Sequence, residues 1–185
     1  MSGLRLFSFD RSGARRKINR APSPLLARSI PWLSVMLASI LPSWLVIASA
    51  PVLPPLGFLV LISWMQLRPG LLPAWAGLPL GLFDDLYSGQ PLGSAILLWS
   101  VATIMLEFIE VRLPWRNFLM EGLVASGLVT GYIVFSLGFA NIAGASTPIQ
   151  VIVPQIVIAL LVYPMIGRFV SLLDRFRLLP FMVVG

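Results

Sequence analysis

Residues 30–50, IPWLSVMLASILPSWLVIASA, contain no charged side chain. An α-helix rises about 1.5 Å per residue, so about 20 such residues cross the apolar core of a bilayer, which is about 30 Å thick. Ala48-Ser49-Ala50 resembles a signal-peptide cleavage site, but the apolar run exceeds the usual length of about 7–15 residues. We interpret the run as an uncleaved first transmembrane helix, and a cleaved signal peptide is the alternative.

Further apolar runs follow along the rest of the chain. Its 185 residues are 58% hydrophobic and 11% charged, against roughly 45–50% apolar residues in soluble domains. The pattern predicts an all-α integral membrane protein, a bundle of six transmembrane helices within residues 29–170. The second span is the least certain, because it is short and contains three prolines. The expected spans are 30–50, 51–67, 71–87, 92–110, 118–139 and 151–169.

All thirteen Lys and Arg residues fall on one side of this six-span topology. Basic residues near the ends of spans stay in the cytoplasm, so both termini are expected there. A five-span arrangement without residues 51–67 would move Arg112 and Arg116 outside. The basic tail, residues 1–28, fixes the topology in our interpretation, and binding of anionic lipid or an acidic partner is the alternative. Residues 171–185 are expected to form a cytoplasmic tail at the membrane interface.

Composition also excludes several kinds of chemistry. The chain has no cysteine and no histidine, which excludes disulfides, thiolate and histidine catalysis, and the usual zinc ligands. The basic residues do not alternate with aromatic ones as in a nucleic-acid groove, so we expect no nucleic-acid partner. We predict no cofactor and no metal.

Two adjacent carboxylates, Asp84 and Asp85, end the third apolar run. Ionisable residues inside a membrane are costly and by default mark function. An intramembrane aspartyl protease needs two carboxylates that face each other, usually from different helices. Neighbours on one helix point about 100° apart, so this pair does not fit that chemistry. A carboxylate here could instead accept backbone N–H bonds in the next turn or at the start of the fourth helix. We therefore expect it to hold a helix hairpin together.

A second group of polar residues lies along the fourth span. Glu107 shares a helical face with Ser100 and Thr103, which suggests a polar seam toward the bundle interior. Helix packing is the first interpretation of this seam, and a ligand or proton path is the alternative. Glu110 and Glu121 lie near span ends and are expected to pair with nearby arginines.

Small residues recur at the spacing of close helix contacts. Gly77 and Gly81 form one GxxxG pair, and Gly127 and Gly131 form another. Such pairs let helix backbones approach each other. We expect both pairs to lie at helix-packing interfaces.

The stretch around the aspartates carries a longer pattern, G-x-x-x-D-L-x-S-G-x-x-L-G. It resembles the signature of the bacterial rod shape-determining MreD family, which has a similar length, number of spans and basic N-terminus. Asp85 takes the family's aspartate position, and Asp84 falls at a variable one. The tail of residues 1–28 has no counterpart in this resemblance. The motif residues here are Gly81, Asp85, Leu86, Ser88, Gly89, Leu92 and Gly93.

The resemblance implies a non-enzymatic subunit of the cell-elongation machinery in the bacterial inner membrane. Members of the family act with MreC, the MreB filament, the RodA glycosyltransferase and a penicillin-binding transpeptidase in lateral wall peptidoglycan synthesis. Their fold is thought similar to the substrate-binding subunits of energy-coupling-factor vitamin transporters. A small-molecule-binding transporter subunit is therefore the alternative function, although the expected outer face offers few polar side chains for a ligand.

Overall fold

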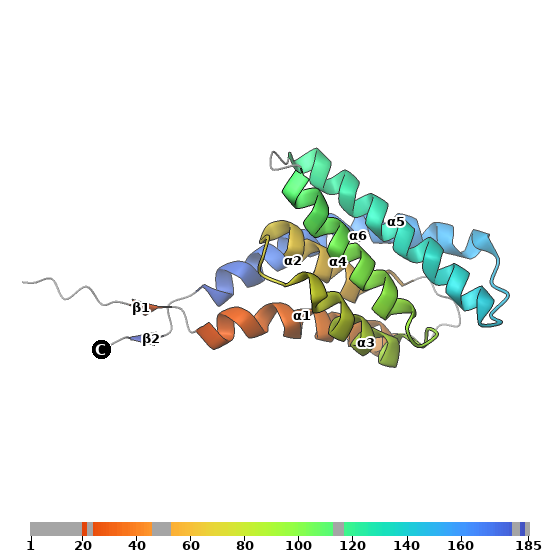
Figure 1. The fold of residues 1–185 in the computed structure, drawn as a ribbon, viewed down its shortest axis with the longest axis horizontal. Coiled ribbons are helices and arrows are strands. Elements are labelled where there is room, and N and C mark those ends of the chain that lie inside the picture. The colour runs from red at the N-terminus through yellow and green to blue at the C-terminus, as the bar shows by residue number, and fades with distance from the viewer. Residues whose placement is uncertain (1–19, 22–23, 46–52, 113–116, 179–181, 184–185) are drawn as a thin grey trace, which may run out of the picture.

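Six α-helices form a bundle in the computed structural model, which describes residues 20–21, 24–45, 53–112, 117–178 and 182–183 (Figure 1). Short 3-10 helices precede α3 and α6, at Ala74–Ala76 and Ile149–Val151. The two-residue strands β1 (Arg20–Ala21) and β2 (Met182–Val183) pair antiparallel. The helices are α1 (Pro24–Leu45), α2 (Leu56–Leu67), α3 (Gly77–Ser88), α4 (Ser94–Arg112), α5 (Phe118–Ile142) and α6 (Ile152–Arg177).

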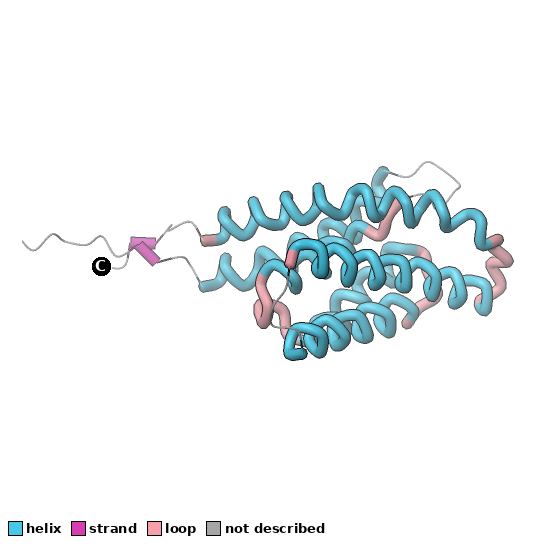
Figure 2. The backbone as a smooth tube through the Cα atoms, turned by 90° about the horizontal axis from the view of Figure 1, so that it is seen from above, coloured by secondary structure: helices cyan, strands magenta, loops and turns pink. Residues whose placement is uncertain are grey.

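Figure 2 shows the helices lying roughly along one axis, with α1 starting and α6 ending on the same side. We call this side the terminal end of the bundle. The opposite side, where α3 turns into α4, is the hairpin end. Contacts between distant segments support the arrangement. At the terminal end Gln66 Nε2 donates to the carbonyl of Glu121, and at the hairpin end Gln155 Nε2 donates to the carbonyl of Leu53.

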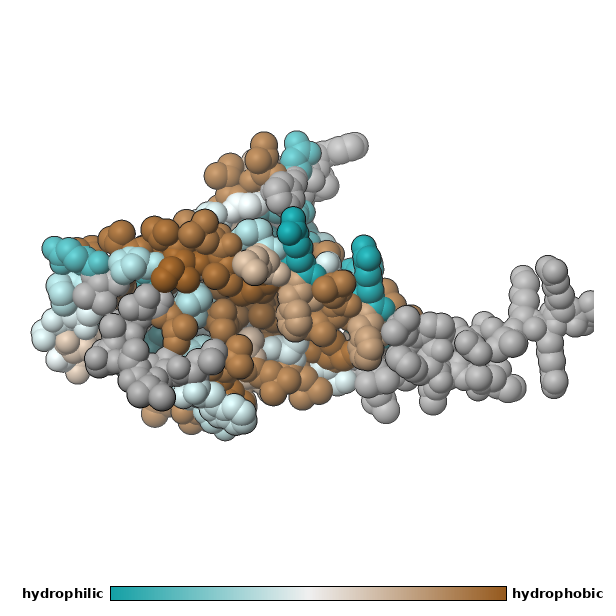
Figure 3. All heavy atoms as spheres, turned by 180° about the vertical axis from the view of Figure 1, so that it is seen from behind, coloured by the Kyte–Doolittle hydropathy of each residue, from teal (hydrophilic) through white to brown (hydrophobic). Residues whose placement is uncertain are grey.

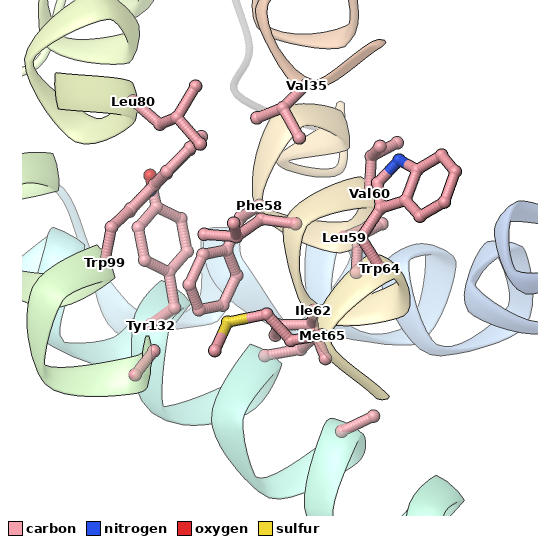
Figure 4. Close-up of a cluster of buried hydrophobic side chains, with 14 of the residues drawn as sticks. Val35, Phe58, Leu59, Val60, Ile62, Trp64, Met65, Leu80, Trp99 and Tyr132 are labelled. Carbon is pink, nitrogen blue, oxygen red and sulfur yellow. The ribbon is translucent and has the colours of Figure 1, made fainter. Parts of the chain in front are cut away.

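The short helix α2 forms the centre of the bundle. All its residues from Gly57 to Gln66 are buried, and Phe58, Leu59, Ile62 and Trp64 lie in the hydrophobic core (Figure 4). With 12 residues α2 extends only about 18 Å, which is less than the thickness of a bilayer core. Two prolines directly before it restrict the backbone at its start. The described helix is therefore shorter than the expected span of residues 51–67.

The third expected span is also shorter in the structure. Residues 71–76 form a turn and a 3-10 helix, and α3 has only 12 residues. Pro73, in an extended conformation with ψ of 155°, immediately precedes the 3-10 helix. The expectation of a continuous helix over 71–87 was wrong for its first turns. Proline lacks the N–H group that a longer helix would need there.

Within the residues that the structure describes, three helices are long and apolar enough to cross a membrane, namely α4, α5 and α6. Large apolar side chains stand exposed on the bundle, including Trp44 at 83%, Val111 at 77% and Leu119 at 76%. Figure 3 shows hydrophobic side chains covering much of the middle of one face. A soluble monomer rarely exposes apolar surface on this scale. These are the properties of a helical membrane protein.

The last helix is longer than the sequence pattern suggests. It continues to Arg177, past the expected end of the span at residue 169, so part of the predicted C-terminal tail is helical. At the terminal end Asp174 accepts hydrogen bonds from Arg68 at 2.9 Å and from Arg177 at 2.7 Å. Arg177 also donates to the carbonyl of Ala27 in α1 and lies over the ring of Trp64. This ion cluster ties α1, α2 and α6 together.

Candidate functional site

The turn between α3 and α4 is organised around Asp85, which is 4% exposed. Its Oδ2 accepts from the backbone N–H of Gly93 at 2.8 Å and of Ile96 at 3.3 Å. Its Oδ1 accepts from the N–H of Ala95 at 2.9 Å and from the hydroxyl of Ser94 at 3.3 Å. The carboxylate therefore binds the first N–H groups of α4, as predicted from the sequence.

The residue that precedes α4 explains why this cap comes from another helix. Gly93 has no side chain, so it cannot cap α4 in the usual way, by a side chain of the residue before the first turn. Asp85 supplies the missing acceptor from the end of α3, and its negative charge lies at the positive end of the α4 dipole. The turn needs glycine, because Gly89 and Gly93 have φ of 69° and 95°.

The first GxxxG pair brings α3 and α4 into backbone contact. A Cβ added to Gly77 would lie 2.7 Å from the backbone of Trp99 and Ser100. A Cβ added to Gly81 would lie 2.7 Å from the carbonyl oxygen of Ala95. Only glycine fits at these positions, and the close approach places Asp85 one turn further on, beside the start of α4.

The remaining motif residues lie around this turn. The hydroxyl of Ser88 accepts from the N–H of Gln90 at 3.5 Å. Leu86 and Leu92 are 65% and 74% exposed. Within the described residues, these leucines contribute little to the bundle core, in contrast to Gly81 and Asp85.

Asp84 points into a different environment from Asp85. It is 8% exposed and interacts with the hydroxyls of Ser39 in α1 and Tyr132 in α5. Trp99 of α4 interacts in turn with Tyr132. Figure 4 shows the Tyr132 ring beside Phe58, with its hydroxyl end toward Trp99 and Leu80. The two neighbouring aspartates are therefore separated by helix geometry, and they do not form a facing pair.

The expected polar seam on α4 divides into separate parts. Thr103 is fully buried and donates to the carbonyl of Ala74 at 2.7 Å, which fastens α4 to the 3-10 helix that precedes α3. Ser100 donates to the carbonyl of Ile96 within its own helix. Glu107 is exposed. The prediction that Glu107 faces the bundle interior was wrong.

Glu110 and Glu121 were expected to pair with Arg112 and Arg116, and the structure describes only one of these two arginines. Glu121 accepts from Gln66 through its backbone carbonyl. The guanidinium of Arg112 lies 4.9 Å from the ring centroid of Phe108. Arg116, an expected partner, lies outside the described residues.

The second GxxxG pair makes no close helix contact within the described chain. A Cβ added to Gly127 or Gly131 would meet no atom of a described neighbour within 4 Å. Both residues instead line an apolar groove of about 320 Å³ between α4 and α5, with Phe58 in its lining. The expected helix packing at these two glycines is therefore not found within the described residues.

The sequence reasoning missed two polar groupings. One is the ion cluster of Arg68, Asp174 and Arg177, whose members lie far apart in the sequence. The other is the set of side chains around Asp84, which come from α1, α4 and α5. Among the described residues, no group of three Asp or Glu side chains could hold a metal ion.

The arrangement at the hairpin end is well suited to holding helices together. Its carboxylate Asp85 is saturated with donors and lies against backbone. No protein-family model matches the chain, and no curated protein or solved structure matches it either.

Proposed function

We propose that this chain is a non-enzymatic membrane subunit of the bacterial cell-elongation complex, of the MreD type, which scaffolds MreC, MreB, RodA and its transpeptidase. The observation that carries the proposal is the Asp85 cap. The motif that resembles the family signature includes this aspartate, and here it binds the N–H groups of Gly93, Ala95 and Ile96. A motif whose aspartate shapes a helix hairpin fits a scaffolding role.

The groove between α4 and α5 supports a scaffolding role. It is apolar, and Gly127 and Gly131 leave its α5 wall open to the close approach of another helix backbone. The occupant we propose is a transmembrane helix of a partner protein. The exposed motif residues Leu86 and Leu92 offer a second apolar contact at the hairpin end.

The distribution of charge supports a cytoplasmic terminal end. Arg68, Arg112 and Arg177 lie at the ends of α2, α4 and α6, whereas the sequence has no Lys or Arg in residues 89–93 or 143–150. Both chain termini then face the cytoplasm, where MreB assembles. A periplasmic reporter fused after Gly144 should be active, and one fused near Arg116 should be silent. The reverse pattern would contradict this orientation.

Depletion tests the proposed function. Rod-shaped cells that lose the protein should become round, and the tagged protein should co-purify with MreC. Gly127→Leu should reduce recovery of MreC or RodA, because the new side chain fills the groove. Gly138→Leu is the matched control, since Gly138 is also open but does not line the groove. Normal cell shape after depletion, with unchanged partner recovery in both variants, would overturn the proposal.

A transporter subunit is the second candidate, because a cavity with several polar side chains in its wall lies at the hairpin end. This cavity of about 220 Å³ is lined by Gln90, Tyr132, Ser136 and Gln155, among others. Loss of uptake of one vitamin after depletion, with cell shape preserved, would favour this candidate over the scaffold.

A further inference from the structure

Unpartnered polar atoms gather around Asp84. In the described part of the chain, three buried side-chain polar atoms near Asp84 lack a well-formed hydrogen bond, namely Ser39 Oγ, Trp99 Nε1 and the hydroxyl of Tyr132. Ser39 and Tyr132 both interact with the Asp84 carboxylate. Such groups in a native interior call for a water, ion or ligand, because each costs free energy when left unpaired.

The charge of Asp84 is also uncompensated by a cation. Its interacting neighbours are the hydroxyls of Ser39 and Tyr132 and the like charge of Asp85. Asp85 is already bound to the start of α4, and the sequence places no Lys or Arg between residues 69 and 111 or between 117 and 167. A buried carboxylate without a cation is costly in an apolar medium. The local chemistry therefore favours a positively charged ligand and disfavours an anion.

A cavity leads to this cluster from the hairpin end. Tyr132 forms part of its wall, and the cavity has a volume of about 220 Å³. Gln90 and Ser136, which also line it, interact with Tyr132 and are hydrogen-bonded to each other at 3.3 Å. The Tyr132 side chain therefore lies between the cavity and Asp84. Its size suits a ligand smaller than a typical drug molecule.

Tyr132 is the aromatic side chain in the cavity wall, and other rings pack behind it. The ring of Phe58 stacks on Tyr132 at a centroid distance of 4.3 Å and lies 5.8 Å from the ring of Trp99, but neither of these two residues lines the cavity. An aromatic ring combined with a carboxylate and hydroxyl oxygens suits an organic ammonium group.

From this geometry we propose that the cavity binds a small primary amine, with its ammonium group donating to the hydroxyl oxygen of Tyr132. The Tyr132 hydroxyl in turn donates to Asp84, whose negative charge complements the ligand. Gln90 and Ser136 contact the remainder of the molecule. The amine is either a free small molecule or the headgroup of phosphatidylethanolamine in the adjacent leaflet. This inference does not depend on a scaffolding role for the protein.

Binding is tested with two probes on the purified full-length protein. Ligand-observed NMR in detergent compares ethanolamine with ethylene glycol, a neutral molecule of similar size. Native mass spectrometry of protein released from nanodiscs compares retention of phosphatidylethanolamine and phosphatidylcholine. We expect ethanolamine to bind at least tenfold more tightly than ethylene glycol, or phosphatidylethanolamine to be retained selectively. The first result identifies a free amine as a ligand and the second a lipid headgroup.

Two variants test whether amine binding depends on Asp84 and Tyr132. Asp84→Asn removes the charge, and Tyr132→Phe removes only the hydroxyl while keeping the stacked ring. Each should weaken the observed binding at least tenfold. Tyr163→Phe is the matched control, because it makes the same change near Gln66 at the terminal end and should bind as the unaltered protein does.

Three outcomes would overturn the proposal. The first is no selective binding of amine in either arm. The second is equal binding of ethanolamine and ethylene glycol without lipid selectivity. The third is unchanged binding by a folded Tyr132→Phe variant, even if Asp84→Asn does not fold. These measurements need no partner protein, so they fail or succeed independently of the scaffold.

Discussion

Asp84 and Asp85 are adjacent in the sequence and both buried, yet they differ in how their charges are satisfied. Asp85 accepts three backbone N–H bonds and one hydroxyl bond at the start of α4. Asp84 interacts with hydroxyls whose oxygen atoms make no well-formed hydrogen bond within the described residues. The filled hydrogen-bonding capacity of the Asp85 carboxylate indicates a structural residue. The incompletely satisfied surroundings of Asp84 indicate a place where something else binds.

A third buried aspartate shows another solution. Asp174 lies between Arg68 and Arg177, so its charge is balanced by guanidinium groups at the terminal end of the bundle. Helix N–H groups therefore bind Asp85, cations bind Asp174, and hydroxyl groups are the neighbours of Asp84. Only the hydroxyl environment of Asp84 leaves a negative charge without a strong counterpart.

The largest effect is expected from Asp85→Ala. The substitution leaves the N–H groups of Gly93, Ala95 and Ile96 without their acceptor, at about 1–3 kcal/mol for each fully buried group. We expect the free energy of unfolding to fall by about 2–4 kcal/mol and the melting temperature in detergent to fall by about 5–15 °C. Asp84→Ala should cost clearly less, and equal losses would end the distinction between the two residues.

Gly81→Ala tests the close contact that positions Asp85. The added Cβ would lie 2.7 Å from the Ala95 carbonyl, so α3 and α4 must separate, at about 1–3 kcal/mol. Gly122→Ala in α5 is the control, because no neighbour lies within 4 Å and alanine favours a helix by up to about 1 kcal/mol. The melting temperature should therefore fall for Gly81→Ala, and it should rise or stay unchanged for Gly122→Ala. A loss confined to Gly122→Ala would refute the packing.

Asp174→Asn should have an intermediate effect on stability. It keeps the shape of the side chain but removes the charge between Arg68 and the buried Arg177. Because Arg68 is half exposed and Arg177 keeps its bond to the Ala27 carbonyl, we expect a loss of about 1–2 kcal/mol. Chemical unfolding in detergent measures this loss. A variant as stable as the unaltered protein would show that the ion cluster does not fasten α6.

Asp84→Asn should have the smallest effect on stability. Removing a buried charge that no cation balances relieves a desolvation cost, so the free energy of unfolding should stay within about 1 kcal/mol or rise. The same change is expected to abolish amine binding. A loss of stability as large as that of Asp85→Ala would show that Asp84 is also a structural residue.

The sequence predicts the hairpin end better than it predicts the bundle centre. Gly77, Gly81 and Asp85 lie within a short segment, so helix periodicity and capping rules are enough to relate them to the start of α4. The side chains around Asp84 come from α1, α4 and α5, and only tertiary packing brings them together. Local patterns hold no information on such distant contacts.

The lengths of the helices show the same limit. The positions of the prolines explain why α2 and α3 are short. In the sequence, however, their apolar runs resemble the neighbouring runs in length, which suggests full transmembrane spans. Near the end of α6, Asp174 pairs with Arg68, which lies far away in the sequence, so no local pattern predicts this contact. Glu107 was expected to face the bundle interior, because periodicity along one helix does not show which of its faces the neighbouring helices cover.

Amide hydrogen exchange at the start of α4 tests the role of Asp85 most directly. The N–H groups of Gly93, Ala95 and Ile96 should exchange slowly in the unaltered protein and in Asp84→Asn. In Asp85→Ala they should exchange much faster, while amides in the middle of α4 keep their protection. Unchanged protection of these three N–H groups in Asp85→Ala would contradict the conclusion that Asp85 holds the hairpin.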